Sequence, residues 1–205
     1  MTTDIEVASQ ALLLLRAETI SSFSEDKSEA QIMNTLYGSF IESILAIYPW
    51  TFATKKRQLN QDTTAPIGEY QYSHIIPSEC MLLWALFNTN SVNSVPITDY
   101  DIYGVEGGRR IYSNYSALYG DYTVYTDENN WPAYFRNFAI HALAAHVAVP
   151  ITGDSELADY YSRVAYGSAN ANRKGGLLGV AMSTDAKQKR NEYIFSSPIV
   201  SARFS

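Results

Sequence analysis

Three histidines and one cysteine are the side chains of this sequence best suited to metal binding or nucleophilic catalysis. His141 and His146 are five positions apart on a predicted helix, about 140° around its axis, so they do not share a face. His146 falls on the apolar side of that helix and His74 lies in a tyrosine-rich strand, which favours structural roles. Cys80 lies in an apolar run, so a buried thiol is favoured over a nucleophile. We therefore expect no catalytic, metal-binding or cofactor-binding residues.

Two acidic pairs have the carboxylates that a glycosidase would use, namely Asp99 with Asp101 and Asp127 with Glu128. Such an enzyme needs two carboxylates on opposite sides of a cleft, one of them with a raised pKa. Asp99 and Asp101 would instead share one face of a strand beside a turn, which favours a polar strand edge. An enzyme that hydrolyses cell-wall glycans therefore stays open only as an alternative.

Two short basic segments offer contacts to phosphate groups. The segment Arg173-Lys174-Gly175-Gly176 lacks the residue order of a phosphate-binding loop, and it follows a predicted helix where that loop would precede one. A helix C-terminus, with basic residues in its last turn and glycine beyond, accounts for it. The segment Lys55-Lys56-Arg57 could touch DNA, but its position at the start of a strand beside a tryptophan favours a solvated or intersubunit face.

Charge and aromatic content point to a protein that works in an assembly. Only 18% of the 205 residues are charged, against an ordinary share of roughly 25%, and 16 are tyrosine. Tyrosine is enriched at protein interfaces, although a tyrosine-rich sheet is an alternative reason for its abundance. Residues 1–162 carry 8 basic and 19 acidic residues, whereas residues 163–205 carry 7 basic and 2 acidic. The acidic part should repel nucleic acid, and the basic end should seek an acidic partner surface or nucleic acid.

The sequence shows no signal for export or membrane insertion. No apolar run approaches the roughly 20 residues that cross a bilayer, and no basic segment precedes an apolar one near the start. The single cysteine leaves no internal disulfide. We therefore expect a protein of a reducing cytoplasm, or of a particle assembled there.

Apolar periodicity predicts four helices, over residues 4–17, 26–48, 132–149 and 155–172. Pro49 and Pro132 mark the places where the chain leaves and re-enters this helical part, and Pro150 is expected to stop the third helix. The glycines at 175, 176 and 179 disfavour any further helix.

Between the second and third helices, residues 51–127 alternate between apolar and polar side chains and carry turn signals, which predicts four to six short antiparallel strands. The expected fold is α+β and mainly α, a four-helix bundle with a β-rich antiparallel insertion between helices two and three. Residues 1–183 would form a single domain, and residues 184–205 an extended C-terminal arm.

The segment 46–57 ends the second predicted helix and opens the β-rich region. Pro49 prevents the helix from continuing, and it favours extended geometry in the residue before it. Trp50 and Phe52 then place large apolar surfaces at the junction. We interpret this junction and the second crossing as a structural hinge with no reactive group. Its residues are Pro49, Trp50, Phe52, Trp131 and Pro132.

The helix followed by Pro49-Trp50-Thr51-Phe52-Ala53 resembles the tail tubular protein A family, the head–tail adaptors of short-tailed bacteriophages. Further segments in the family's order extend the resemblance over most of residues 8–165. They are Ala8–Leu15 with Ile20-Ser21-Ser22-Phe23, Tyr70-Gln71-Tyr72, Ile76-Pro77-Ser78-Glu79-Cys80-Met81, Tyr122–Asp127 with Trp131-Pro132, and Leu143–His146 with Val149–Asp154. Two features depart from the family: Arg16 stands where a glycine often follows the leucines, and the glycine-rich stretch after Ala171 has no clear counterpart.

The resemblance implies a structural virion protein and no enzyme. It implies a dodecameric ring between the portal protein and the tail nozzle protein, with tail fibres as further candidate partners. Genomic DNA would pass through the ring during ejection without specific binding, and neither a cofactor nor a membrane would take part. The ring would lie in the virion tail after assembly in the host cytoplasm. The alternatives are a tail-associated cell-wall hydrolase and a nucleic-acid-binding module, which the acidity of residues 1–162 argues against.

The expected C-terminal arm is the candidate segment for docking on the portal. Its basic side chains would steer association with an acidic surface, and its aromatic side chains would act as apolar anchors. Serines and a proline favour extended geometry, which suits strand addition or an intersubunit groove. Packing of the arm on its own bundle stays open as the alternative. The candidate docking residues are Lys187, Lys189, Arg190, Tyr193, Phe195 and Phe204.

Overall fold

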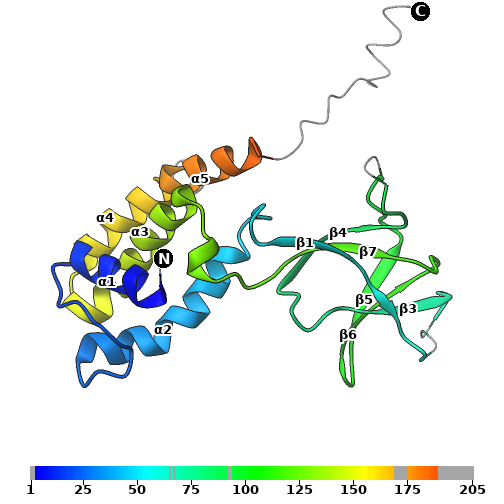
Figure 1. Ribbon diagram of the computed structural model, residues 1–205, viewed down its shortest axis with the longest axis horizontal. Helices are drawn as coiled ribbons and strands as arrows, with labels where there is room; N and C mark the ends of the chain where they lie inside the picture. Colours follow the sequence, from blue (N-terminus) through cyan, green and yellow to red (C-terminus); the bar gives the residue numbers. More distant parts are fainter. Residues whose placement is uncertain (1–2, 65, 67, 92–93, 169–174, 189–205) are drawn as a thin grey trace, which may run out of the picture.

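The computed structural model describes residues 3–64, 66, 68–91, 94–168 and 175–188. In this part of the chain a helical body lies beside a β-rich body, and the chain crosses between them twice (Figure 1). The helices are α1 (Asp4–Leu14), α2 (Ser28–Leu45), α3 (Ala133–Thr152), α4 (Ser155–Tyr166) and α5 (Gly176–Ala186), with a short 3-10 helix at Glu128–Asn130. The strands are β1 (Thr54–Gln58), β2 (Asn60–Gln61), β3 (Tyr72–Ile75), β4 (Leu82–Phe87), β5 (Tyr100–Val105), β6 (Gly108–Ser113) and β7 (Tyr119–Thr123).

The predicted fold class is wrong. In place of a four-helix bundle with a β-rich insertion, the described residues form a mixed α/β fold with five helices and two antiparallel sheets. The β-rich body has a hydrophobic cluster of its own, separate from the helical core. The buried members of that cluster are Leu59, Ile76, Cys80, Leu86, Ile111, Leu118, Tyr122 and Val124. Alternation along a strand says which side chains face inward, but not that several strands will enclose a second core.

Helix α1 shows how local chemistry sets the ends of an element. It begins with a capping box, in which the side chains of Thr3 and Glu6 each accept a hydrogen bond from the other's backbone N–H. It ends before the predicted boundary because Arg16 adopts a left-handed φ of 59°. The N–H of Ala17 then donates to the carbonyl of Leu12 at 3.1 Å, the closure typical of a glycine cap. An arginine in this conformation costs about 1 kcal/mol.

Helix α3 lies at the centre of the helical body and contacts the other four helices. Its fully buried aromatic and aliphatic side chains include Phe135, Phe138, Leu143 and Val147. The expectation that Pro150 stops this helix is wrong, because the helix continues to Thr152. A proline so close to the end removes only one N–H from the ladder, and the true stop is Gly153, whose φ is 71° and whose N–H donates to Val149 at 2.9 Å.

Helix α5 corrects the expectation that the glycine-rich segment 175–179 disfavours helix. Gly176 instead permits a close approach to the end of α4, since a Cβ there would lie 2.4 Å from the carbonyl oxygen of Val164. Once the helices touch, Leu178 and Ala181 are buried between them. This burial outweighs the intrinsic cost of glycine in a helix, which is about 1 kcal/mol per residue.

The chain passes from one sheet into the other between strands β1 and β2. One sheet has the order β1-β7-β4 and the other β2-β3-β6-β5, with all pairs antiparallel. Leu59 separates β1 from β2 and is buried in the β-rich core, so the chain bends there from one sheet into the other. Strands β1 and β5 each lie at an edge of their sheet.

The close approach at Gly176 predicts opposite effects for two glycine-to-alanine substitutions. We expect Gly176→Ala to lower the free energy of unfolding by roughly 1–3 kcal/mol, because the new methyl group meets backbone atoms and the φ of 57° disfavours it. Gly38→Ala in α2 is the matched control, with no atom within 4 Å of the added Cβ. That control should gain roughly 0.5–1 kcal/mol. Urea unfolding followed by circular dichroism measures both, and equal effects would contradict the packing described.

Candidate functional site

The first crossing between the two bodies is anchored by Trp50, whose side chain is fully buried. The backbone N–H of Trp50 donates to the carbonyl of Tyr48 at 2.8 Å, which makes a tight turn around Pro49. The indole packs edge-on against Phe135 at 4.9 Å between ring centroids, and its Nε1 donates to the carbonyl of Ile44 at 3.2 Å. Helix α2 ends at Leu45, before the predicted boundary at residue 48, so Pro49 follows the helix end. The residue after this proline is locked into the core of the helical body.

The second crossing meets the same ring of α3. Trp131 of this crossing lies 5.0 Å from Phe135, and Phe52 of the first crossing lies 4.8 Å from it, measured between ring centroids. The Trp131 Nε1 donates to the carbonyl of Thr126 at 2.8 Å, and Pro132 is the N-cap of α3. We call residues 48–53 and 124–132 the joint. The structure brings three of the five predicted hinge residues, Trp50, Phe52 and Trp131, onto the ring of Phe135. Sequence reasoning gave Phe135 only a place in an apolar stripe.

Asp185 is the functional candidate that sequence reasoning missed. It lies near the end of α5, is fully buried, and reaches across to the joint. Its carboxylate accepts hydrogen bonds from the backbone N–H of Thr51 at 3.1 Å, from the Thr51 hydroxyl at 2.7 Å and from the Tyr134 hydroxyl at 2.7 Å. Burial, followed by the hydrogen bond to Asp185, raises the pKa of Tyr134 to about 12. The available signal was a carboxylate within the apolar segment 177–186.

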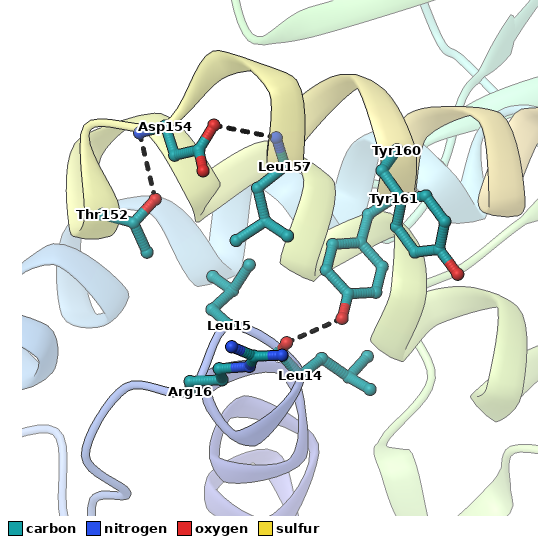
Figure 2. A pocket seen from close by; sticks show the side chains of 8 residues that line it. All are labelled: Leu14, Leu15, Arg16, Thr152, Asp154, Leu157, Tyr160 and Tyr161. Carbon is teal, nitrogen blue, oxygen red and sulfur yellow. Dashed lines mark hydrogen bonds between the residues drawn. The ribbon is translucent and has the colours of Figure 1, made fainter.

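A pocket of about 650 Å³ opens where the end of α1 meets the α3–α4 turn (Figure 2). Tyr161 donates to the carbonyl of Leu14 at 2.6 Å, and the Asp154 carboxylate caps α4 through the N–H groups of Glu156 and Leu157 at 2.9 and 3.1 Å. Those polar groups are therefore engaged within the protein. The remaining wall combines leucine side chains with the exposed Arg16 and Tyr160. The lining residues are Leu14, Leu15, Arg16, Thr152, Asp154, Leu157, Tyr160 and Tyr161.

A second pocket, of about 410 Å³, lies at the joint. Its wall combines the aromatic ring of Phe52 with the exposed Tyr125 and with Lys55. Tyr125 is half-exposed, and its partial burial, followed by the nearby carboxylates of Glu128 and Asp127, raises its pKa to about 12, so this hydroxyl stays protonated near neutral pH. The other lining residues are Val124, Thr126, Asp127 and Asn130.

The three histidines and the cysteine have different environments and do not form a cluster. His74 is fully buried in the β-rich body, and its Nε2 lies 3.4 Å from the carbonyl of Ser116. His141 contacts the carbonyl of its own helix through Nδ1, and His146, expected in the core, is exposed and stacks on Phe40 at 5.1 Å. Burial raises the pKa of the Cys80 thiol. Within the described residues no group of three His, Cys, Asp or Glu side chains is arranged to hold a metal ion.

The two acidic pairs do not have the arrangement that a glycosidase needs. Asp99 and Asp101 are exposed at the edge of the second sheet, where Asp101 accepts from the hydroxyl of Tyr70 at 3.0 Å. Glu128 is buried and accepts from Tyr37 at 2.9 Å, whereas its neighbour Asp127 is exposed. Neither pair faces across one of the two pockets described.

The predicted basic features divide between described and undescribed residues. Lys55, Lys56 and Arg57 lie on the exposed strand β1. In the expected arm, Thr184 to Ala186 belong to α5 and Lys187 is its C-cap, so the chain is helical where an extended arm was expected to begin. The other candidate docking residues, Lys189, Arg190, Tyr193, Phe195 and Phe204, lie outside the described residues.

Comparison with known proteins assigns no family. A scan against models of protein families gives no match, and a search of curated proteins gives none either. Among the described residues, no helix combines the length and apolar character needed to cross a membrane.

Replacement of Asp185 should loosen α5 selectively. In Asp185→Ala, the donors of Thr51 and Tyr134 lose a shared charged acceptor, which we expect to cost roughly 2 kcal/mol or more. Hydrogen exchange should accelerate in α5 and around Thr51 while β6 keeps its protection. Asp159→Ala, an exposed change on α4, is the control and should leave these rates within experimental error. Unchanged exchange in α5 would show that the carboxylate does not hold this helix.

The burial of His74 predicts a loss of stability in mild acid. Burial lowers the pKa of His74 below its ordinary value of about 6.5. Above that value the imidazole is neutral in both the folded and the unfolded chain. Below it the unfolded chain takes up a proton more readily than the folded chain does, so the free energy of unfolding decreases as the pH is lowered. His74→Gln should therefore reduce the fall in melting temperature between neutral and mildly acidic pH. His141→Gln is the control, and an equal reduction in both variants would refute the assignment to His74.

Proposed function

We propose that this protein is a structural head–tail adaptor of the tail tubular protein A type, a ring subunit placed between a portal protein and a tail nozzle. The observation that supports the proposal is the two-body architecture of the subunit. Two unlike bodies, one helical and one β-rich, lie side by side and are joined by two crossings (Figure 1). The aromatic residues of these crossings pack on Phe135 of the helical body. A protein that connects two different partners needs two different surfaces held at a constant orientation.

Exposed apolar side chains on both bodies support an assembled state. Isolated residues of this kind are ordinary on a soluble surface, but here they occur on both halves of the subunit. Their burial against neighbouring subunits, portal and nozzle would follow from the proposed ring. They are Leu13, Val149, Tyr160 and Val180 on the helical body, and Val95, Ile102 and Tyr103 on the β-rich body.

The charge distribution is compatible with a channel for DNA. Residues 1–162 carry a marked acidic excess, and like charge disfavours tight contact with phosphate groups. Genomic DNA would then pass without adhering to the wall. The proposed role is non-enzymatic, uses no cofactor and belongs to the virion tail, with tail fibres as further candidate partners.

The decisive experiment mixes the full chain with its cognate portal protein and images the mixture by negative stain. We expect rings on the portal. A chain ending at Gln188 keeps the hydrogen bond from that side chain to Tyr134, at 3.2 Å, and lacks the rest of the proposed docking arm. It should fold and occupy fewer portals. Equal occupancy would remove the arm from the docking role.

Peptidoglycan zymography of the same preparation tests the enzymatic alternative. Monomers that leave the portal bare and clear peptidoglycan would replace the adaptor with a hydrolase, above all if Asp99→Asn or Asp101→Asn abolished the clearing. Rings without clearing support the adaptor.

A further inference from the structure

Strand β5 is a long and exposed edge. It lies last in the order β2-β3-β6-β5, and among the described residues its ladder partner is β6. Ile102 pairs with the fully buried Ile111 yet is itself 45% exposed, so the apolar face of the sheet ends at an open side chain. On the other face, Tyr103 is 46% exposed and packs on Tyr112 at 5.1 Å.

Natural edge strands are usually protected against pairing with other chains. Lysine, proline, inward-pointing charges or bulges provide that protection. The sequence of β5 contains neither lysine nor proline, and its single charge, Asp101, accepts hydrogen bonds from Tyr70 and Tyr103. The paired register of β5 with β6 runs without a shift from Tyr100 to Val105. The edge therefore keeps the features that favour addition of another strand.

Strand β1 is an edge of the opposite charge. It ends the order β1-β7-β4, and four of its five residues are exposed. Lys55 and Arg57 share one carboxylate, that of Glu79, at 2.9 and 3.9 Å. Lys56 lies on the other face, 3.8 Å above the ring of Phe87. Three consecutive cations thus flank this edge. Glu79 pairs with two of them, and Asp121 lies opposite Lys56 in the ladder.

The two edges are complementary in charge as well as in hydrogen bonding. The segment 99–106 carries Asp99, Asp101 and Glu106 and no basic residue, whereas β1 carries three cations. We propose that β5 of one subunit adds as a strand beside β1 of a second copy of this chain. Backbone hydrogen bonds would provide affinity, and the charges would select this pairing over others.

Pairing between unlike edges gives a head-to-tail contact, which is the kind that closes rings. Pairing of β5 with β5 would oppose carboxylates, and pairing of β1 with β1 would oppose cations, so both symmetric dimers are disfavoured. The inference deepens the proposed function and rests on it for the closed ring, but strand addition itself makes a separate prediction about which residues meet.

Cross-linking of the full chain tests the contact directly. Lys56→Cys and Ile102→Cys are prepared as separate variants, and each is treated with a bifunctional maleimide, alone and in an equal mixture. We expect covalent dimers in the mixture and at most traces in either variant alone, because each edge meets its unlike partner. The unsubstituted chain, whose Cys80 is buried, is the control for background coupling.

Homodimers of Ile102→Cys would replace the proposal with a symmetric β5 contact, and a mixture without dimers would overturn it. Circular dichroism confirms that both variants are folded. Imaging distinguishes the adaptor role from strand addition. Rings without the cross-link would exclude strand addition and retain the adaptor. Cross-linked open chains without rings would exclude the adaptor and retain strand addition.

Charge reversal gives an independent measurement. Sedimentation velocity over a range of concentrations should show about a tenfold weaker self-association for Lys56→Glu, and the association of the unsubstituted chain should weaken as salt is raised. Lys27→Glu makes the same charge change on the helical body, and we expect its effect to stay within about twofold. Equal weakening by both variants would show that net charge acts, not the β1 edge.

Discussion

Burial of aromatic side chains against Phe135 is the contact that anchors both crossings to the helical body. The ring of Phe135 is shared by the first crossing, through Trp50 and Phe52, and by the second, through Trp131. Loss of a buried tryptophan or phenylalanine side chain typically costs about 3–5 kcal/mol, a large fraction of a domain's stability. Because both crossings meet the same ring, movement of either chain segment would disturb the core of the helical body as well as the joint.

Asp185 extends this constraint to the last described helix. A buried carboxylate is unfavourable unless it is hydrogen-bonded, and the Thr51 and Tyr134 donors meet that need. Such a contact contributes more to the position of α5 than to overall stability, since apolar residues would fill the same space with less desolvation. Helix α5, which precedes the expected docking arm, is consequently held against the joint by these hydrogen bonds. A partner held by that arm would be positioned relative to both bodies.

The sequence predicted the existence of the first four helices and the β-rich region, because apolar periods of 3.6 and 2 are properties of single segments. It did not predict α5, since the cost of glycine is local while the approach of Gly176 to Val164 depends on where α4 ends. The effect of Pro150 depends on its distance from the helix end in the same way. A proline disrupts a helix interior, but Pro150 lies two residues before the end of α3. An acidic residue in an apolar segment could mark Asp185 as unusual, but its partners could not be predicted, because Thr51, its main donor, is 134 positions away.

A fixed orientation of the two bodies would matter for assembly, because a ring closes only when every contact rotates successive subunits by the same angle. Head-to-tail contacts whose rotation does not close give open filaments. In the proposed arrangement β1 follows directly from the joint, after Trp50 and Phe52, while β5 is carried by the second sheet. The orientation of the β-rich body therefore sets the angle between neighbouring β-rich bodies and, through the joint, between neighbouring helical bodies. The aromatic contacts on Phe135 would thus fix the geometry of the ring as well as the fold of its subunit.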